Sequence, residues 1–286
     1  MQIKKVCIIG GGLMGRQIAL NTAIYPFEVT VFDANPAVLD DLAKWEDTYL
    51  AGRIAKGRMT EEQVAQIRSR FTICTTLEEA LKDADLVIEA IIERKDIKSQ
   101  VLRQVSTLVR EDTIIATNSS RMASSIFAGD VSNPSRLANL HYFNPALVMK
   151  LVEVVQGEHC ADETAQALYD FAVATGKEPI WIKKEVEGFI VNRMLQALKN
   201  EARWLVENGY CTPQEVDKAC ERGLNHPMGP FRLEDFSGID LTYNIMLRKI
   251  EETGEIPVGY ELIKSYYDKG WYGKKTGRGF YEYENK

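Results

Sequence analysis

Short apolar runs alternate with longer amphipathic stretches over the first half of the chain. Five runs have the length and composition of buried strands: 6–9, 28–32, 71–74, 86–90 and 113–116. Helical spacing of apolar residues lies between them, at 13–24, at 36–68 with interruptions near Gly52 and Gly57, and at 101–109. Strands that alternate with helices are typical of parallel β-α-β units. The pattern therefore predicts a parallel sheet with helices packed on it.

The pattern changes after about residue 185. Further apolar runs at 137–143, 151–155 and 179–182 extend the strand-rich part, and one long helical segment follows at 189–206. The rest of the chain has no convincing strand pattern before a short tail at 279–281. We therefore expect two domains, an α/β domain over residues 1–184 and an all-α domain over residues 185–286. A length of 286 residues by itself fits two domains or one large one.

Charge and hydropathy narrow the class of protein. The net charge is −6, so the chain lacks the basic balance of a nucleic-acid-binding protein, and we expect no nucleic-acid partner. No run of about 18 apolar residues is present, which argues against a membrane span. The N-terminus leads directly into a strand without the apolar core of a signal peptide. These features favour a cytoplasmic protein without a membrane partner.

The cysteines give no sign of a metal site. Their number is odd, their spacing is wide and no CxxC pair occurs, so neither a zinc site nor a disulfide framework is indicated. We expect reduced, buried thiols.

A glycine-rich turn follows the first strand. Its residues are Gly10, Gly11, Gly12, Leu13, Met14 and Gly15. In such a turn Gly10 permits the tight bend, Gly12 lets a pyrophosphate approach the backbone, and Gly15 lets helix and strand pack closely. The second strand then ends at Asp33, where an acid binds the ribose hydroxyls and repels a 2′-phosphate. Residues 1–184 are thus predicted to form a Rossmann-type domain that binds NAD rather than NADP.

Several longer motifs occur in order along the chain. They are 141–153 (HYFNPALVMKLVE), 188–193 (GFIVNR), 226–230 (HPMGP) followed by 238–240 (GID), and 270–281 (GWYGKKTGRGFY). Together they resemble the signatures of the 3-hydroxyacyl-CoA dehydrogenase family, and the chain length resembles that of the stand-alone bacterial 3-hydroxybutyryl-CoA enzymes. The resemblance implies NAD-dependent oxidation of an L-3-hydroxyacyl-CoA in fatty acid metabolism. It also implies a homodimer formed through the helical domain.

Oxidation of a secondary alcohol requires a base for the hydroxyl proton, and histidine suits this task near neutral pH. Of the three histidines, His159 is expected in an exposed turn, and His226 precedes a proline in a motif that holds a loop. His141 ends a predicted strand, and Glu153 on the next strand could face it across the intervening loop. The resemblance assigns these two residues the catalytic His–Glu dyad, in which the carboxylate orients the ring and stabilises the imidazolium.

The resemblance also assigns partners of the substrate oxygen. Ser119 matches the family serine that hydrogen-bonds this oxygen, although the local order leaves Ser120 as an alternative. Asn192 matches an asparagine that helps to polarise the same oxygen. Glu187 stands where the family usually has proline.

Four residues are placed around the cofactor by resemblance: Glu93, Lys98, Ser119 and Asn144. From spacing alone, Glu93 and Lys98 would be solvated charges at the start of a helix.

A local basic cluster favours CoA as the carrier of the substrate. Arg53, Lys56 and Arg58 lie in the second helical stretch, and such side chains are apt phosphate partners. Lys56 matches a family lysine that contacts CoA, while Tyr49 replaces a family serine. A solvated basic face is the alternative interpretation of this cluster.

Two other functions stay open. A dehydrogenase of the same superfamily could act on a hydroxy substrate without CoA, such as carnitine, L-gulonate or a pyridine alcohol. A cofactor-binding protein with a structural role, as among lens crystallins of the superfamily, is the non-enzymatic alternative, and the complete set of His141, Glu153, Ser119 and Asn192 argues against it.

Overall fold

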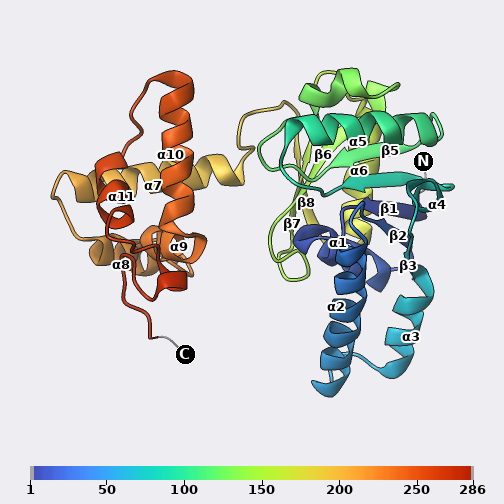
Figure 1. Cartoon of the computed structure of the whole chain (residues 1–286), viewed down its shortest axis with the longest axis horizontal. Helices are drawn as coiled ribbons and strands as arrows, with labels where there is room; N and C mark the ends of the chain where they lie inside the picture. The colour runs from blue at the N-terminus through green and yellow to red at the C-terminus, as the bar shows by residue number, and fades with distance from the viewer. Residues whose placement is uncertain (1–2, 285–286) are drawn as a thin grey trace. The chain divides into compact units, whose positions relative to one another are not determined.

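The computed structural model describes residues 3–284 and divides the chain into two compact units (Figure 1). The first unit ends at Ile190 and the second begins at Val191. The segment before this division packs on the first unit, because Glu185 accepts hydrogen bonds from Ser124 and Ser125 there. The domain boundary expected after residue 184 stays a prediction.

The first unit is built on one eight-stranded sheet. Its strands are β1 (Lys5–Ile9), β2 (Glu28–Phe32), β3 (Phe71–Ile73), β4 (Leu86–Glu89), β5 (Ile114–Thr117), β6 (Leu137–Tyr142), β7 (Leu151–Val155) and β8 (Glu178–Ile182), in the order β3-β2-β1-β4-β5-β6-β7-β8. All neighbours are parallel except β6 and β7. The strand order reverses at β1 and β4, the place where open α/β sheets bind ligands.

Helices cover both faces of this sheet. They are α1 (Leu13–Ile24), α2 (Pro36–Ala55), α3 (Glu61–Arg70), α4 (Leu77–Leu81), α5 (Lys95–Leu108) and α6 (Asp162–Ala174), with short 3-10 turns η1 (Ser124–Asp130) and η2 (Pro134–Arg136). Apolar side chains of α1, α2, α3 and α6 share one core with the sheet, and those of α4, α5 and η1 share another. The predicted fold, an α/β sheet domain followed by a helical domain, is confirmed.

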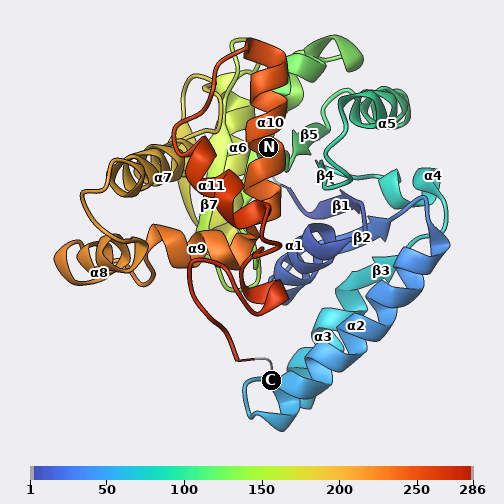
Figure 2. The same ribbon diagram turned by 60° about the vertical axis from the view of Figure 1, so that its left-hand side comes forward.

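The helical stretch expected at 36–68 forms two helices, α2 and α3, which run side by side (Figures 1 and 2). Only one of the two expected interruptions is present: the chain turns at Gly57, whose φ is +62°, while Gly52 lies inside α2. Arg68 of α3 pairs with Asp47 of α2 at 2.5 Å. Helix α4 was not expected, because five residues are too short for a periodic pattern.

Within residues 191–284, the second unit consists of helices, apart from two isolated bridges near its end. Its elements are α7 (Val191–Glu207), α8 (Pro213–Gly223), α9 (Pro230–Ser237), α10 (Ile239–Thr253), α11 (Tyr260–Tyr267) and the 3-10 turn η3 (Lys274–Thr276). The tail at 279–281 is not a strand; Asp235 holds it by accepting the N–H groups of Phe280 and Tyr281. Across residues 3–284, no helix is both long and apolar enough to span a bilayer.

All five cysteines are free thiols. Four are buried and Cys211 is half-buried, which agrees with the thiols expected from the sequence. Burial raises the pKa of Cys7 and that of Cys160 to about 12.

Candidate active site

The strand pair β6–β7 places His141 directly opposite Glu153. The two residues are partners in the antiparallel register, and the His141 Nδ1 to Glu153 Oε2 distance is 2.8 Å. Both side chains are buried, with exposed fractions of 5% for His141 and 0% for Glu153. Cross-strand neighbours on one face of a sheet have adjacent Cβ atoms, so the sheet register itself creates this contact.

The surroundings of the pair leave one ring nitrogen for chemistry. The rings of Phe143 and Phe189 lie 4.6 and 5.6 Å from the imidazole, and the Ile190 N–H donates to Glu153 Oε1 at 3.0 Å. Because an ionised carboxylate only accepts hydrogen bonds, Nδ1 carries the hydrogen in this contact. In the neutral ring Nε2 is then an acceptor, which is the state that a general base requires.

The glycine turn between β1 and α1 has room for a phosphate. Gly10 has a φ of +106°, and a Cβ on Gly15 would lie 1.7 Å from the Gly10 carbonyl oxygen, so both positions require glycine. A Cβ on Gly12 would meet no atom within 4 Å, which marks open space beside the backbone. Leu13 and Met14 begin α1, where the first N–H groups lack partners inside the helix and attract anions. The turn therefore fits the pyrophosphate of NAD.

Asp33 lies just beyond β2 and is tied to this turn. Its Oδ2 accepts the Gly11 N–H at 2.9 Å, and its Oδ1 accepts the Asn35 N–H at 2.9 Å. No cation pairs with Asp33 among residues 3–284. The carboxylate is thus fixed in direction and keeps a negative charge available for ribose hydroxyls.

A buried network joins the ends of β4 and β5 to the start of α5. Lys98, 1% exposed, donates to Glu89 at 2.6 Å and lies 3.2 Å from Glu93, and Glu89 also accepts from Thr117 at 2.6 Å. Burial disfavours the ionised Glu93 carboxyl, but the hydrogen bond from Ser119 and the charge of Lys98 outweigh burial and lower its pKa. Three residues expected at the cofactor, Glu93, Lys98 and Ser119, are therefore brought together.

Glu89 of this network was missed in the sequence. It is fully buried at the end of an apolar strand, where an acid requires a cationic or hydrogen-bonding partner. A carboxylate at the C-terminal end of an otherwise apolar strand was the signal that could have identified it.

The two candidate serines differ in burial. Ser119 is 2% exposed, donates to Glu93 and accepts from the Met122 N–H at 2.9 Å, whereas Ser120 is half-buried. Asn144, also expected at the cofactor, is exposed and precedes Pro145 in the loop between β6 and β7.

Other candidates lie away from this network. Asn192 is the second residue of α7 and belongs to the second unit, and Lys56 is exposed at the C-terminal end of α2. His226 follows α8, and its N–H donates to the Cys220 carbonyl. His159, expected to be exposed, is half-buried, because its Nε2 lies 3.1 Å from the carbonyl oxygen of Leu137.

A dinucleotide-binding sheet with a buried histidine–carboxylate pair defines a class of protein, the nicotinamide-dependent oxidoreductases. Comparison with known proteins specifies the family. The family model "3-hydroxyacyl-CoA dehydrogenase, NAD binding domain" matches residues 5–186, and the model "3-hydroxyacyl-CoA dehydrogenase, C-terminal domain" matches residues 188–283. The chain belongs to the 3-hydroxyacyl-CoA dehydrogenase family and is an NAD-dependent oxidoreductase.

Individual relatives agree with this assignment over the whole chain. A probable 3-hydroxybutyryl-CoA dehydrogenase of Bacillus subtilis is 37% identical, with 100% of this chain and 99% of that protein covered. The solved structure of (S)-3-hydroxybutyryl-CoA dehydrogenase from Ralstonia eutropha is 34% identical with a TM-score of 0.90, covering 99% of this chain and 100% of that one. A structure described as a diketoreductase that acts on dicarbonyl compounds is 32% identical with a TM-score of 0.88, covering 99% and 100%.

Proposed function

We propose that this enzyme oxidises an L-3-hydroxyacyl-CoA to the 3-ketoacyl-CoA with NAD and also catalyses the reverse reduction. The proposal rests on the buried contact between His141 Nδ1 and Glu153 Oε2, in the same sheet unit as the glycine turn. A short acyl chain, of the 3-hydroxybutyryl type, is supported by the names of the relatives from Bacillus subtilis and Ralstonia eutropha.

In the oxidative direction, neutral His141 accepts the substrate hydroxyl proton at Nε2. NAD supplies the hydride acceptor. Glu153 holds the ring through Nδ1 and stabilises the imidazolium once the proton has arrived, because the opposite charge is already in place. Asn192 donates a hydrogen bond to the substrate oxygen, and the Ser119 hydroxyl does so when its single hydrogen turns from Glu93 to the substrate. In the reverse direction the charged His141 returns the proton.

The cofactor is held by groups from both sides of the strand-order reversal. Gly10, Gly12, Leu13, Met14 and Gly15 form the pyrophosphate turn. Asp33 binds the ribose. Glu93, Lys98 and Ser119 complete the site on the β4–β5 side, where Glu89 fixes the Lys98 ammonium. Asn144 contributes from the loop between β6 and β7.

We assign the remaining roles to CoA binding and assembly. Lys56 binds a CoA phosphate, and the helical unit contributes substrate contacts and the homodimer interface. An apolar hollow of about 480 Å³ in that unit supports an interface, since it is lined mainly by α7 and α8 and lies beside the 62%-exposed Leu224. Light scattering should give twice the chain mass; a monomer at assay concentration would contradict the dimer. The cytoplasmic location stays a prediction.

The substrate is tested with NADH and two keto compounds. Acetoacetyl-CoA should be reduced much more efficiently than free acetoacetate, because binding energy of the remote CoA moiety positions the keto group. The measurement is kcat/KM for each compound under the same conditions. Equal values would show that CoA is not the carrier.

A second candidate is reduction or oxidation of a substrate without CoA. Tyr49 in place of the family serine and the structural similarity to the diketoreductase support it. Efficient turnover of free dicarbonyl compounds together with weak turnover of acetoacetyl-CoA would establish this candidate instead.

A further inference from the structure

The chain between β8 and α7, residues 183–190, has an unfavourable backbone where it meets His141, and we call it the linker. Gly188 and Phe189 both have a positive φ, +75° and +51°. A bulky residue such as phenylalanine rarely adopts this conformation, so contacts around the linker must hold it. The Phe189 side chain is buried, and its ring lies 5.6 Å from the His141 imidazole. The strained part of the linker is thus beside the proposed base.

The linker also sets the direction of the Glu153 carboxylate. Its Oε1 accepts the Ile190 N–H at 3.0 Å, and its Oε2 contacts His141 Nδ1 at 2.8 Å. With one oxygen bound by the linker, the other is turned toward the imidazole. Displacement of Ile190 would therefore remove a contact that orients the carboxylate, and acid–base catalysis is sensitive to such changes in geometry.

Glu185 fastens the linker to a second part of the sheet unit. Its Oε1 accepts the Ser124 Oγ–H and the Ser125 N–H, both at 2.9 Å. Ser124 is fully buried and Glu185 is half-buried, so water has little access to the contact between them. Hydrogen bonds to an ionised acceptor are strong, and a low local dielectric strengthens them further. The position of the linker therefore depends on these two hydrogen bonds.

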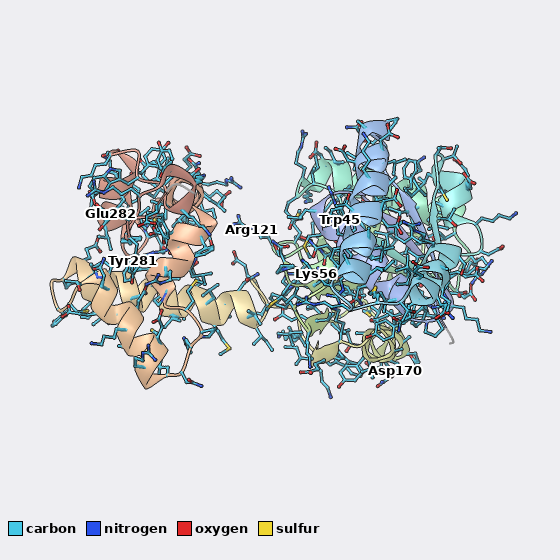
Figure 3. All side chains as sticks on the ribbon, turned by 90° about the horizontal axis from the view of Figure 1, so that it is seen from below. Trp45, Lys56, Arg121, Asp170, Tyr281 and Glu282 are labelled. Atoms are coloured by element: carbon cyan, nitrogen blue, oxygen red, sulfur yellow. The ribbon has the colours of Figure 1, made fainter. Side chains whose placement is uncertain are left out.

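The stretch that Glu185 reaches, residues 118–125, also carries Ser119. Figure 3 labels Arg121, which belongs to this stretch. The buried Asn139 amide of β6 binds the stretch at three points: it accepts the Ser124 N–H at 2.7 Å and donates to two backbone carbonyl oxygens, one of them that of Ser119, at 3.3 and 3.0 Å. Ser124 is therefore firmly connected to Ser119, and through Ser124 so is the linker.

His159 and Gly157 shape the place where Glu185 is held. His159 Nε2 lies 3.1 Å from the Leu137 carbonyl oxygen and 3.4 Å from Ser124 Oγ. A carbonyl oxygen only accepts hydrogen bonds, so Nε2 carries a hydrogen, and Ser124 directs its own hydrogen to Glu185. A Cβ on Gly157 would lie 2.6 Å from His159 Nδ1 and 2.7 Å from Glu185 Oε1. Any larger residue at this position would displace one of the two side chains.

From this geometry we propose that Glu185 is a positioning residue for the reaction. By joining the linker to the 118–125 stretch, it keeps the Ile190 N–H on Glu153 and holds the linker and Ser119 in one fixed arrangement. The His141–Glu153 pair and the serine assigned to the substrate oxygen are thereby kept in register. Glu185 acts through these contacts and not on the substrate. This inference rests on the proposed roles of Glu153 and Ser119.

The first test compares two acids of the linker. Glu185→Ala should lower kcat for acetoacetyl-CoA reduction roughly 10- to 100-fold, because small displacements of catalytic groups have effects of this size. KM for NADH should stay within about twofold, because the glycine turn is unaltered. Glu187→Ala is the matched control and should keep kcat, since Glu187 is exposed and its side chain has no partner within residues 3–284. An unchanged kcat in Glu185→Ala, or an equal loss in Glu187→Ala, would overturn the proposal.

The conservative variant separates the hydrogen bonds from the charge. Glu185→Gln keeps an oxygen that can accept from Ser124 and Ser125, so it should retain kcat within about threefold of wild type. A loss as large as that of Glu185→Ala would show that the two hydrogen bonds do not carry the effect, which contradicts the proposed role.

Hydrogen exchange measures the position of the linker directly. The Ile190 amide is bound to Glu153, so it should exchange slowly in wild type and in Glu187→Ala, and faster in Glu185→Ala. A merely structural role would lower the Tm and leave both this exchange and kcat per folded molecule unchanged. Slow exchange in Glu185→Ala together with a lower kcat would also overturn the proposal, because Glu185 would then act by another route.

Gly157→Ala disturbs the same contact without removing a polar group, and it serves if Glu185→Ala does not fold. Its methyl group should displace Glu185 or His159, so kcat should fall in the same direction. In the double variant with Glu185→Gln the losses should not multiply, because both changes act on one contact. A wild-type kcat in Gly157→Ala with Ile190 exchange unchanged would contradict the proposal.

The proposed function and the role of Glu185 fail in different ways. If His141→Gln keeps the kcat of wild type, the proposed acid–base mechanism itself is wrong. If His141→Gln loses kcat and Glu185→Ala keeps it, only the role of Glu185 is wrong.

Discussion

Each unit of the chain contains a buried carboxylate that contacts a basic side chain, and the two contacts can be compared. In the sheet unit Glu153 contacts His141 at 2.8 Å, and in the helical unit Glu234 accepts two hydrogen bonds from Arg203, both at 2.8 Å. All four residues are at most 5% exposed. Burial and pairing are thus the same in both places and do not by themselves identify a catalytic group.

The partners differ in what they can do with a proton. Arg203 stays charged at every pH that the protein meets, and Lys199 and Thr242 also contact Glu234. Burial opposes ionisation of Glu234, but the charges of Arg203 and Lys199 outweigh it and lower its pKa. The imidazole of His141 instead has a second nitrogen, Nε2, which lies outside the contact with Glu153 and can accept or donate a hydrogen. The first pair suits catalysis, and the second suits structure.

The largest expected effect is on catalysis at His141. His141→Gln should lower kcat by about 10²–10⁴-fold, the usual contribution of general acid–base catalysis. Affinity for NADH, measured by its fluorescence, should be retained because the glycine turn is unaltered. His226→Gln is the control and should keep kcat within a few-fold. A large loss of kcat at His226 with a small loss at His141 would show that the active site is not at the His141 motif.

Substitution in the Arg203–Glu234 pair should lower stability and leave catalysis intact. Arg203→Met leaves the Glu234 charge buried without the Nη2 group that contacts both its oxygens, and removal of one member of a buried ion pair typically costs about 3–5 kcal/mol. Urea unfolding should show a loss of this size in the free energy of unfolding, while kcat per folded molecule stays near wild type. A loss of kcat in Arg203→Met without a loss of stability would show that the Arg203–Glu234 pair is not purely structural.

Asp33 is a third carboxylate, without a cationic partner among the described residues, and its proposed task is cofactor choice. Its charge should repel a 2′-phosphate, and every 1.4 kcal/mol of repulsion is tenfold in affinity. We expect kcat/KM with NAD to exceed that with NADP by roughly tenfold or more. Asp33→Ser should narrow this ratio; equal values for the two cofactors in wild type would refute the role.

The buried thiols offer the smallest effect, on stability at alkaline pH. Burial raises the pKa of Cys7 to about 12, so the folded protein keeps its proton where the unfolded chain, with a thiol pKa near ~8.5, loses it. Titration of Cys7 should therefore leave the free energy of unfolding unchanged below about pH 8.5 and lower it as the pH rises toward 12. Cys7→Ala should flatten this fall in urea titrations between pH 8 and 11. If the free energy of unfolding falls equally steeply with pH in wild type and in Cys7→Ala, Cys7 is not the cause of the fall.

Much of the fold follows from local patterns, and the site follows from them only in part. The alternation of strands and helices, Asp33 at the end of β2 and the glycine turn could be predicted, because each is a property of a short segment. The register that sets His141 against Glu153 could be expected from two strands joined by one loop. The role of Glu89 could not be predicted in this way, because it depends on contacts with Lys98 and Thr117, which are 9 and 28 residues away along the chain.

The central claim is that His141 and Glu153 act as one acid–base unit. A double-mutant cycle with His141→Gln, Glu153→Gln and the double variant tests it through kcat for acetoacetyl-CoA reduction. If Glu153 acts through the ring, its substitution should matter little once His141 is gone, and the double variant should be no slower than about the His141→Gln enzyme. A double variant slowed by the product of the two single effects would show that the residues act independently, which contradicts the account.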